Sequence, residues 1–365
     1  MEKFYIAALS HFLGYAAAKK IDVLIGYYGS AQAVHQAGSK AVEYLHPTAA
    51  LEQCYKSRYD KDLPQALTNY CQEHCLRVIT RNDGEYPQLL KEIYDPPAAL
   101  YVKGRALNAS PQLAIVGSRK ASAYGITVAQ TFARTLATQG LTIVSGGAYG
   151  IDAAAHVGTL EAAGSTIVVL GGGFTNLYPA KHKKMFSDIL AKGTLVTEYA
   201  PWEGARGIYF PLRNRIIVGL CTGVLIVEAA QKSGAMITAN LALHENREVY
   251  VIPGNIFSTT SQGTNGLIKE GARLIDSPTE ILADFILPSK GTAPLVQSSL
   301  FAQENSSNNL AKQGILKEIF AQPGITLEEL VLKLDLTLSA VSCILLELQL
   351  AGQIVQEKHH TYRAI

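Results

Sequence analysis

The sequence lacks the residue patterns that identify several common enzyme classes. No Gly-Lys pair occurs in it, so it has no Walker A lysine, and it contains neither a GxSxG nor an HExxH motif. These absences exclude a P-loop nucleotide hydrolase, a serine hydrolase with a nucleophile elbow and a zinc protease of the HExxH type. A binding protein is therefore a stronger hypothesis than a catalyst.

Cysteine is scarce, and its spacing gives no disulfide framework. The chain has five cysteines in 365 residues, an odd number that fits a reducing compartment. Cys71, His74 and Cys75 form a CxxHC cluster, but no second ligand pair at zinc spacing follows it. We therefore expect no metal site.

Long apolar runs are also missing. The longest, from Ile216 to Val227, is interrupted by Gly and Thr and is too short to span a bilayer. The apolar segment from Phe4 to Ala18 could mimic a signal peptide, but Glu2 precedes it and Lys19 and Lys20 follow it. We expect a cytoplasmic protein without a membrane partner.

The chain is rich in apolar residues and carries almost no net charge. Hydrophobic residues make up 48% of it, and its formal net charge is only +2. A chain of this length and composition can form two or three domains with a substantial core. Any affinity for nucleic acid must come from local clusters of Lys and Arg rather than from the total charge.

The central part of the chain reads as alternating strands and helices. Short β-rich runs cover Leu113 to Val116, Leu141 to Val144 and Thr166 to Leu170, and helix-like segments separate them. This order predicts an α/β fold with a Rossmann-like, doubly wound, mostly parallel sheet and right-handed crossovers. Further strands are predicted at Thr194 to Glu198, Val224 to Val227 and Glu248 to Ile252.

The loops that follow these strands are rich in Gly and Ser. We expect them to lie along one edge of the sheet, where backbone N–H groups and helix N-termini favour an anion, above all phosphate. A dinucleotide-binding unit would have an acid after its strand to hold the ribose, whereas Leu170 runs into three glycines, so neither NAD nor another cofactor is predicted. The loop residues predicted to bind phosphate are Gly117, Ser118, Ser145, Gly146, Gly147, Gly171, Gly172, Ser233 and Gly234.

Two groups of cations stand at predicted helix starts. Lys181, Lys183 and Lys184 follow a proline that suits the start of one helix, and Arg213 and Arg215 stand at the start of another. Cations at a helix N-terminus oppose the helix dipole unless an anion offsets their charge. Two such departures from helix preferences beside one crevice predict that these side chains bind an anion.

Composition divides the chain into four parts. Residues 1–75 read as a small all-α domain of short helices, and residues 76–286 contain the extended sheet. Residues 287–309 are rich in Ser, Asn, Gln and Pro and are predicted to be a linker. Residues 310–365 have the order of three helices and a hairpin that is typical of a winged helix.

The third helix of this predicted winged helix carries no Lys or Arg. A reader of duplex DNA needs basic side chains against the phosphates, and only Lys358, His359, His360 and Arg363 in the wing could supply them. We therefore expect this domain to contact protein rather than to read duplex DNA.

Between Leu76 and Phe285 the sequence contains VGSR, SGGAYGID, LGGG followed by YP, TEYAP, FPLRNRIIVGL, VEAAQKSGAMITA, VIPG and GTNGLIKEGA. This set of motifs resembles the DNA-processing protein A (DprA/Smf) family. The resemblance implies a homodimer that binds single-stranded DNA through a Rossmann-like core. It also implies that the protein loads a RecA-type recombinase during natural transformation.

The resemblance further implies which residues contact DNA. They are Arg119 of the GSR motif, the three lysines named above, and the segment Arg213, Asn214 and Arg215. Phe186 stands where similar proteins can offer an aromatic surface to a base.

The chain departs from the family pattern in three places. Thr175 replaces an acid, and His182 stands where Asn is common after the YP pair. In the N-terminal helices only Gly14 matches the GxG of a helix-hairpin-helix. These departures predict a locally different pocket and leave a DNA-binding role of residues 1–75 unsupported.

An enzymatic alternative stays open. Related Rossmann-like nucleotide hydrolases have a Gly-rich edge and a glutamate after a buried strand, so Glu228 together with Asp152 could act on the N-glycosidic bond of a nucleotide. A carboxylate is also favoured in the first turn of a helix, and this structural role explains Asp152 better. We expect a non-catalytic protein and keep hydrolysis as the alternative.

Overall fold

The structure, a computed structural model, describes residues 1–285, 312, 314–322, 324–334, 336–350, 354–356 and 361–364. The chain forms two compact units, Met1–Leu287 and Pro288–Ile365. Within the described ranges, no helix has the length and apolar character needed to cross a membrane.

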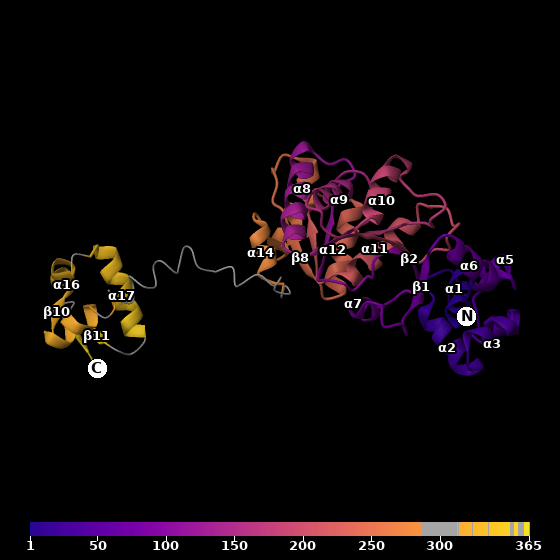
Figure 1. Ribbon diagram of the computed structural model, residues 1–365, viewed down its shortest axis with the longest axis horizontal. Coiled ribbons are helices and arrows are strands. Elements are labelled where there is room, and N and C mark those ends of the chain that lie inside the picture. Colours follow the sequence, from indigo (N-terminus) through magenta and orange to yellow (C-terminus); the bar gives the residue numbers. More distant parts are fainter. Residues whose placement is uncertain are drawn as a thin grey trace. The chain divides into compact units, whose positions relative to one another are not determined.

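The larger unit is built around a nine-stranded sheet (Figure 1). Its strands follow the order β1-β2-β6-β5-β4-β3-β7-β8-β9 in space. Neighbours from β6 to β9 are parallel, whereas β1 and β2 extend the sheet by antiparallel pairing. The strands are β1 Arg77–Thr80, β2 Ala99–Gly104, β3 Gln112–Val116, β4 Thr142–Ser145, β5 Thr166–Val169, β6 Thr194–Thr197, β7 Gly223–Ile226, β8 Glu248–Val251 and β9 Arg273–Leu274. The predicted α/β fold with a mostly parallel sheet is confirmed.

The direction in which the chain adds strands reverses at β3. After β3 the chain adds β4, β5 and β6 on one side, and it then returns to add β7, β8 and β9 on the other. In a doubly wound sheet such a topological switch point leaves a crevice between the loops that follow its two central strands. Here those strands are β3 and β7, so the fold itself determines where a ligand can enter.

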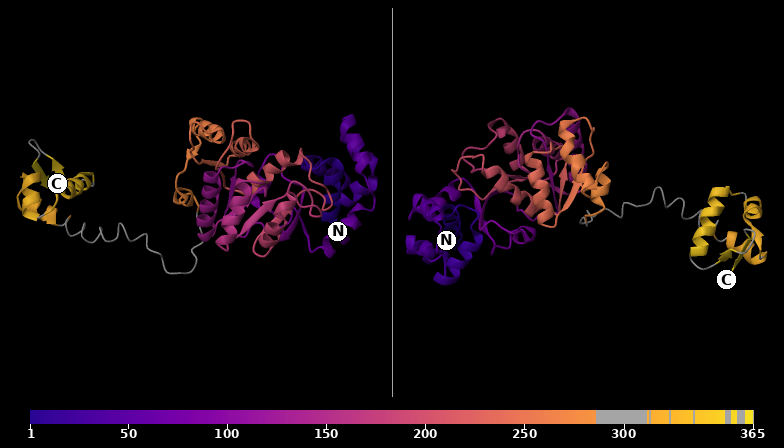
Figure 2. Two further views of the ribbon diagram at one scale, coloured as in Figure 1. Left: turned by 90° about the horizontal axis from the view of Figure 1, so that it is seen from above. Right: turned by 180° about the vertical axis from the view of Figure 1, so that it is seen from behind.

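Helices cover both faces of the sheet (Figure 2). Along β3, Ala114 and Val116 pack into the core on one face, whereas Leu113 and Ile115 pack into the core on the other. A strand buried on both faces reads as an unbroken apolar run, which is why these strands are visible in the sequence. The helices are α7 Gln88–Lys91, α8 Ala123–Thr138, α9 Ile151–Glu161, α10 Lys183–Leu190, α11 Tyr209–Leu220, α12 Gly234–His244, α13 Gln262–Lys269 and α14 Pro278–Leu282, with the short 3-10 turns η1 Ala180–His182 and η2 Thr259–Ser261.

Six helices precede the sheet, as the sequence predicts for residues 1–75. Their apolar side chains form one core together with residues of β1 and β2, among them Val78 and Tyr101. The boundary at residue 75 stays a prediction, because these helices and the sheet belong to one compact unit. The helices are α1 Glu2–Leu13, α2 Ala18–Tyr28, α3 Ala31–Ala37, α4 Ser39–Glu43, α5 Ala49–Arg58 and α6 Leu63–Glu73.

A buried tyrosine cluster joins the N-terminal helices to the start of α11. Tyr15, Tyr199 and Tyr209 pack against one another, and Tyr199 and Tyr209 are stacked with ring centroids 4.2 Å apart. The hydroxyls of Tyr15 and Tyr209 donate to the Glu203 carboxylate over 3.3 and 2.9 Å. Because Tyr209 is the first residue of α11, this cluster positions the helix that forms one wall of the crevice.

The smaller unit has an apolar core of its own, which includes Ile315, Leu330, Val341 and Ile354. A helix over residues 314–321 is followed by β10 Ile325–Thr326, α16 Leu327–Leu334, α17 Leu338–Leu350, β11 Ile354–Gln356 and β12 Thr361–Ala364, and the strands pair in the order β10-β12-β11. The winged helix stays a prediction. The predicted linker, residues 287–309, and the wing residues Lys358, His359 and His360 lie outside the described residues.

Candidate functional site

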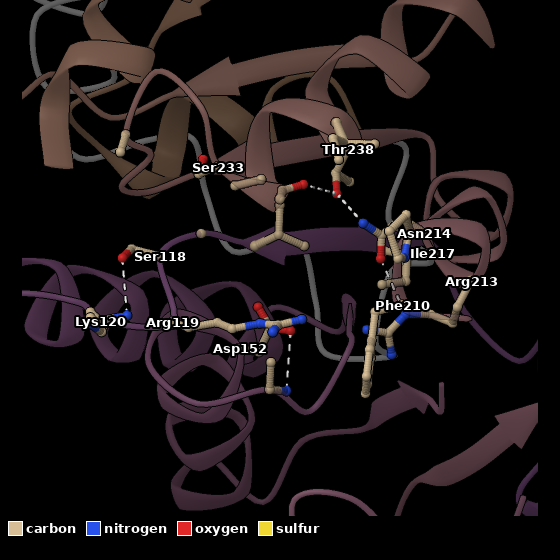
Figure 3. Close-up of a pocket in the computed structure, with 18 of the residues that line it drawn as sticks. Ser118, Arg119, Lys120, Asp152, Phe210, Arg213, Asn214, Ile217, Ser233 and Thr238 are labelled. Carbon is tan, nitrogen blue, oxygen red and sulfur yellow. Dashed lines mark hydrogen bonds between the residues drawn. The ribbon is translucent and has the colours of Figure 1, made fainter. Parts of the chain in front are cut away.

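A crevice of about 630 Å³ opens at the switch point, between the loops that follow β3 and β7 (Figure 3). Seven of the residues predicted to bind DNA or phosphate meet there, namely Gly117, Ser118, Arg119, Arg213, Asn214, Ser233 and Gly234. The other lining residues are Val116, Lys120, Ala148, Asp152, Gly207, Phe210, Pro211, Ile217, Ala230, Ala235, Ile237, Thr238 and Thr260.

Helix α12 directs its N-terminus into this crevice. Ser233 is its N-cap residue, but the side chain makes no capping hydrogen bond, and the buried hydroxyl has no partner in the described part of the chain. Gly234 and Ala235, the first residues of the helix, line the crevice as well. The first N–H groups of a helix have no acceptor within it and form the positive end of its dipole. An uncapped start that faces a crevice is therefore suited to an anion.

The loop after β3 presents two exposed cations on the opposite side of the crevice (Figure 3). Neither Arg119 nor Lys120 forms an ion pair with any residue that the structure describes. The Arg119 guanidinium lies 5.2 Å from the centroid of the Phe210 ring. The loop backbone is fixed, because the Ser118 N–H donates to the Glu228 carbonyl over 2.7 Å.

Arg213 adds a buried positive charge at the floor of the crevice. Its Nη1 donates to the carbonyls of Gly146, over 2.9 Å, and of Val169, so it joins the ends of β4 and β5 to α11. Burial lowers the pKa of Arg213 to about 10, which leaves it charged at neutral pH. Only glycine fits at position 146, since a Cβ there would lie 2.4 Å from this guanidinium.

Asp152 faces the crevice but serves the loop that follows β4. Its Oδ2 accepts the N–H groups of Gly146 and Ala148 over 3.1 and 3.3 Å. Burial raises the pKa of this carboxyl, and Arg213 and the two N–H groups oppose the shift. The carboxylate thus occupies the N–H group of Gly146, a residue that the sequence predicts to bind phosphate.

Five of the predicted phosphate-binding residues do not line the crevice, which corrects the expectation that every loop offers free backbone. Gly146 is buried, and its N–H donates to Asp152. The Ser145 hydroxyl donates to the Ile115 carbonyl over 2.7 Å and is buried. The other three, Gly147, Gly171 and Gly172, are buried where a Cβ would meet Phe186, Phe210 and Ala205 respectively. The loops after β4 and β5 therefore serve mainly to pack α10 and α11 against the sheet.

Two further site predictions are corrected. Phe186 is fully buried in a core with Val168 and Ile189, so its ring cannot offer a surface to a base. Arg215 is buried too, with its Nη2 2.7 Å from Glu198 and its Nε 3.1 Å from Asp95. Although burial disfavours its charged form, these two carboxylates raise the pKa of Arg215 above its usual value.

The positions of the two arginines in α11 explain why only Arg213 lines the crevice. The helix begins at Tyr209, so neither Arg213 nor Arg215 lies in its first turn, and the helix dipole does not bear on them as predicted. Two residues correspond to a rotation of about 200° around a helix. Arg213 consequently points to the crevice, whereas Arg215 points to the buried carboxylate of Glu198 on another side.

The three predicted lysines are exposed beside the crevice rather than in it. Lys181 lies in η1, and Lys183 and Lys184 form the first turn of α10. Lys184 is 2.8 Å from Asp188, but both side chains are largely exposed, and such pairs contribute little. Lys181 and Lys183 have no carboxylate partner among the described residues.

A smaller hollow adjoins the crevice and contains residues that the sequence analysis missed. Tyr149, Tyr178 and Phe210 line it together with Arg119. Arg119 and Phe210 also line the crevice, so the two depressions share part of their lining. The available signal was the position of these aromatic residues in or next to Gly- and Pro-containing loops at the edge of the sheet.

Glu228, the other residue of the enzymatic alternative, caps helix α8. Its carboxylate accepts the Ser122 N–H over 2.9 Å and the Ser122 hydroxyl over 2.5 Å, and the Thr260 hydroxyl donates to it over 3.3 Å. Across the residues that the structure describes, no group of three or more His, Cys, Asp or Glu is arranged to hold a metal ion.

The sequence matches the model of the family described as DNA recombination-mediator protein A over residues 77–286, more than half of the chain. The chain belongs to this family. It is 38% identical over 238 residues to the DNA processing protein DprA of Bacillus subtilis, a match that covers 65% of this chain and 80% of the relative. The crevice and the adjoining hollow both lie within the matched region of this recombination-mediator family.

Two solved structures of the family are similar to this chain. The X-ray structure of DNA processing protein A from Streptococcus pneumoniae has a TM-score of 0.67 and 32% identity, and the match covers 79% of this chain and 99% of that one. The protein from Helicobacter pylori, described for its single-stranded DNA binding mode, has a TM-score of 0.53 and 30% identity over 57% of this chain and 98% of that one. The fold of this chain is thus similar to that of two solved proteins of the DNA recombination-mediator protein A family.

Proposed function

We propose that this chain binds single-stranded DNA along the crevice and hands it to a RecA-type recombinase. The observation that carries the binding step is the uncapped N-terminus of α12, which faces Arg119 and Lys120 across one crevice. A phosphate group matches both sides, because the helix start offers N–H donors and the loop offers full positive charges.

The distribution of cations favours a strand over a single nucleotide. Arg119 and Lys120 lie at the crevice, and Lys181, Lys183 and Lys184 continue the positive surface on η1 and α10. The whole chain carries only +2, so this surface is a local concentration of charge. A positive groove with exposed aromatic side chains beside it is typical of proteins that bind unpaired strands.

The comparisons support the same reading. The relative from Helicobacter pylori is described as binding single-stranded DNA, and the family is described as a recombination mediator. From these relatives we extend two finer proposals to this chain, that it acts as a homodimer and that it promotes assembly of a RecA-type recombinase on the bound strand.

The hydrogen bonds of Glu228 and Asp152, the two residues of the hydrolase alternative, favour a non-catalytic role. Both oxygens of Glu228 accept hydrogen bonds from Ser122 or Thr260, and Oδ2 of Asp152 accepts two N–H groups of the loop after β4, so among these four oxygens only Oδ1 of Asp152 has no donor in the described residues. A general base needs a free oxygen directed at its substrate. Incubation of the protein with nucleoside monophosphates tests this choice, and release of free base would favour the hydrolase.

The binding step is tested at the N-cap of α12. Ser233→Asp should cap the helix but place a carboxylate where we place a phosphate. We expect the thermal midpoint to be unchanged or higher, and the affinity for an oligothymidylate to fall on the order of tenfold because of charge repulsion. Fluorescence anisotropy of a labelled strand measures this.

The matched control is Ser30→Asp at the N-cap of α3, in the N-terminal helices. The Ser30 side chain already accepts the Ala33 N–H over 3.1 Å, so an aspartate there repeats the existing cap. This variant should bind the strand as the unchanged protein does. Equal affinity of both variants would place the phosphate site elsewhere.

The recombinase step needs its own measurement. On single-stranded DNA that is already coated by a single-strand-binding protein, a RecA-type recombinase should hydrolyse ATP sooner when this chain is present. An unchanged lag with normal strand binding would contradict recombinase loading and leave the binding step intact.

A further inference from the structure

His182 is a titratable side chain within the positive surface of η1 and α10. It is the last residue of η1 and the N-cap residue of α10, so the exposed Lys181 and Lys183 flank it in the sequence. Its side chain makes no capping hydrogen bond to α10. The ring packs instead against Tyr149, with the two centroids 4.8 Å apart. His182 therefore lies on the surface along which we place the strand.

One hydrogen bond determines which nitrogen of this imidazole carries the proton. Nδ1 of His182 lies 3.0 Å from the carbonyl oxygen of Gly147, and a carbonyl oxygen can only accept. Nδ1 is therefore the donor, and Nε2 of the neutral ring has a lone pair and no hydrogen. A phosphate oxygen is an acceptor as well, so the neutral ring has no hydrogen bond to offer it at Nε2.

Nε2 is the nitrogen that remains available to a ligand. It has no hydrogen-bond or ion-pair partner among the described residues, and it is not one of the buried polar atoms that lack a partner. His156 differs in this respect, because its Nε2 is buried and unpartnered. The two nitrogens of an imidazole point away from each other, so the bond to Gly147 directs Nε2 of His182 away from the loop after β4. A proton added there gives a donor and a positive charge.

The surroundings of His182 disfavour that added proton in the free protein. A positive charge at the start of α10 opposes the helix dipole. His182 and His156 also repel each other when charged, since His182 contributes to the low pKa of His156. The other titratable or cationic groups around it are Lys181, Lys183 and Lys184 on η1 and α10, Tyr149 after β4, and Arg213, which acts on His156 as well.

No carboxylate in the described part of the chain forms an ion pair with His182. The acids on the neighbouring helices α9 and α10 are engaged elsewhere. Asp152 accepts the N–H groups of Gly146 and Ala148, Glu161 pairs with Arg134, and Asp188 pairs with Lys184. An anion that balances a charge on His182 must therefore come from a ligand.

We propose that His182 contacts a phosphate of the strand in its protonated form, so that strand binding takes up a proton at Nε2. The inference rests on the proposed function, because the phosphate belongs to the strand that the lysines bind. A phosphate offsets the charge that the lysines and the helix dipole disfavour, so the complex holds the proton more tightly than the free protein does. By linkage, the affinity for the strand must then rise as the pH falls.

The test measures strand affinity against pH with the full-length protein and an oligothymidylate, whose charge is constant over the range used. From about pH 8 to about pH 5.5 the affinity of the unchanged protein should rise about three- to tenfold, the effect of one added charge near the surface. The slope of log affinity against log salt should also become steeper by about 0.7 at the lower pH, because one more phosphate is contacted.

His182→Asn is the decisive variant. Its amide can still donate to the Gly147 carbonyl but cannot gain a charge, so it should bind as the unchanged protein does at about pH 8 and lose most of the rise in acid. The matched control is His46→Asn, an exposed histidine in the N-terminal helices whose φ of 46° suits asparagine. This control should keep the full pH dependence.

Calorimetry gives a second measurement that does not depend on the value of the affinity. The heat of strand binding, measured near neutral pH in two buffers with different ionisation heats, counts the protons taken up. The unchanged protein and His46→Asn should take up a proton fraction that His182→Asn does not. Thermal unfolding at both ends of the pH range shows whether each variant is folded in the assay.

The outcomes separate this inference from the proposed function. If the unchanged protein binds the strand with a normal salt dependence, but its affinity does not change with pH or rises equally in His182→Asn, the protonated contact is refuted and strand binding stands. An equal loss of affinity in His182→Asn at every pH would also refute it, because the imidazole would then act without its charge. If the unchanged protein binds no single strand at any pH, both proposals fail.

Discussion

Two helices begin at the same edge of the sheet, on either side of the switch point. They differ in whether a side chain caps their first N–H groups. Helix α8 follows β3 and is closed: the Ser122 hydroxyl accepts the Gly125 N–H over 3.0 Å, and Glu228 accepts the Ser122 N–H and hydroxyl. Helix α12 follows β7 and is open, since Ser233 makes no such bond. Side chains of the protein thus cap the start of α8, whereas the start of α12 has no side-chain cap and is suited to a ligand.

The difference shows how a function can be located in a fold that many proteins share. Buried polar groups are nearly always satisfied by the protein itself, as they are around Glu228 and Asp152. A buried hydroxyl without a partner, as at Ser233, is the exception that needs an explanation. Six buried side-chain polar atoms lack a partner among the described residues, and Ser233 is the one of them that lines the crevice, opposite two cations.

The largest expected effect is on the free energy of unfolding, which should fall when the cap of α8 is removed but stay nearly the same when Ser233 is changed. Glu228→Ala leaves the Ser122 and Thr260 groups without their buried acceptor and should lower the free energy of unfolding by about 2–4 kcal/mol. Ser233→Ala removes a hydroxyl that has no partner and should change it by less than about 0.5 kcal/mol. Urea unfolding of both variants measures this, and equal losses would contradict the comparison.

A dependence of stability on pH is expected from His156, which is fully buried in α9. The Thr166 hydroxyl donates to the Ile143 carbonyl and lies 2.7 Å from His156 Nδ1, so Nδ1 must be the donor to it, and the buried Nε2 has no partner in the described structure. Burial, with smaller contributions from His182 and Arg213, lowers the pKa of His156 to about 3.

The sign of this effect follows from the direction of the shift. Because the folded pKa lies below the unfolded value, the full stability is present above about pH 6.5 and is lost as the pH falls toward 3. Between pH 7 and pH 5 the free energy of unfolding should fall by roughly 2 kcal/mol. His156→Gln should flatten this part of the profile, and urea unfolding at several pH values would show a persistent slope if another group were responsible.

The affinity for single strands at the uncapped start of α12 and the cations near it should depend on the salt concentration. Arg119→Ala, and Lys183→Ala together with Lys184→Ala, should each weaken single-strand binding, on the order of tenfold, because each removes a partner for phosphate. Each lost contact should also reduce the slope of log affinity against log salt by about 0.7. Anisotropy titrations over a range of salt concentrations measure both. Unchanged affinity and slope in both variants would refute this placement of the strand.

The sequence allowed the sheet and the edge of the site to be predicted, because both depend on local patterns. β3 and β7 are unbroken apolar runs that are buried on both faces, and the rule for strand ends then places Gly117 and Ser233 in one crevice. What a side chain does after it leaves the backbone was harder to predict. Arg215 looked like a second Arg213 until Glu198 and Asp95, distant in sequence, were found beside it.

Which aromatic side chains are exposed at the site was hard to predict for a related reason. Phe186 lies on the buried side of a short helix, whereas Tyr178 and Tyr149 lie in loops that carry no periodic pattern. A pattern in sequence can show which face of a helix is apolar. It cannot show which loop residues from separate segments meet, because their meeting depends on how the loops after β4 and β5 pack against α10 and α11.

The smallest effect on single-strand affinity is expected from removal of residues 310–365. This truncation tests whether the uncapped start of α12 and the cations near it are sufficient for binding. The crevice, the lysines and the aromatic hollow all belong to Met1–Leu287, which is a compact unit by itself, and the smaller unit buries Val341, Ile344 and Leu348 in its own core. Since α17 also contains no Lys or Arg, it offers no cation to a phosphate. The truncated protein should bind single strands within a few-fold of the full chain in the anisotropy titration. Binding that is tens of times weaker, or tight binding of duplex DNA by the isolated 310–365 fragment at physiological salt, would show that the smaller unit reads DNA itself.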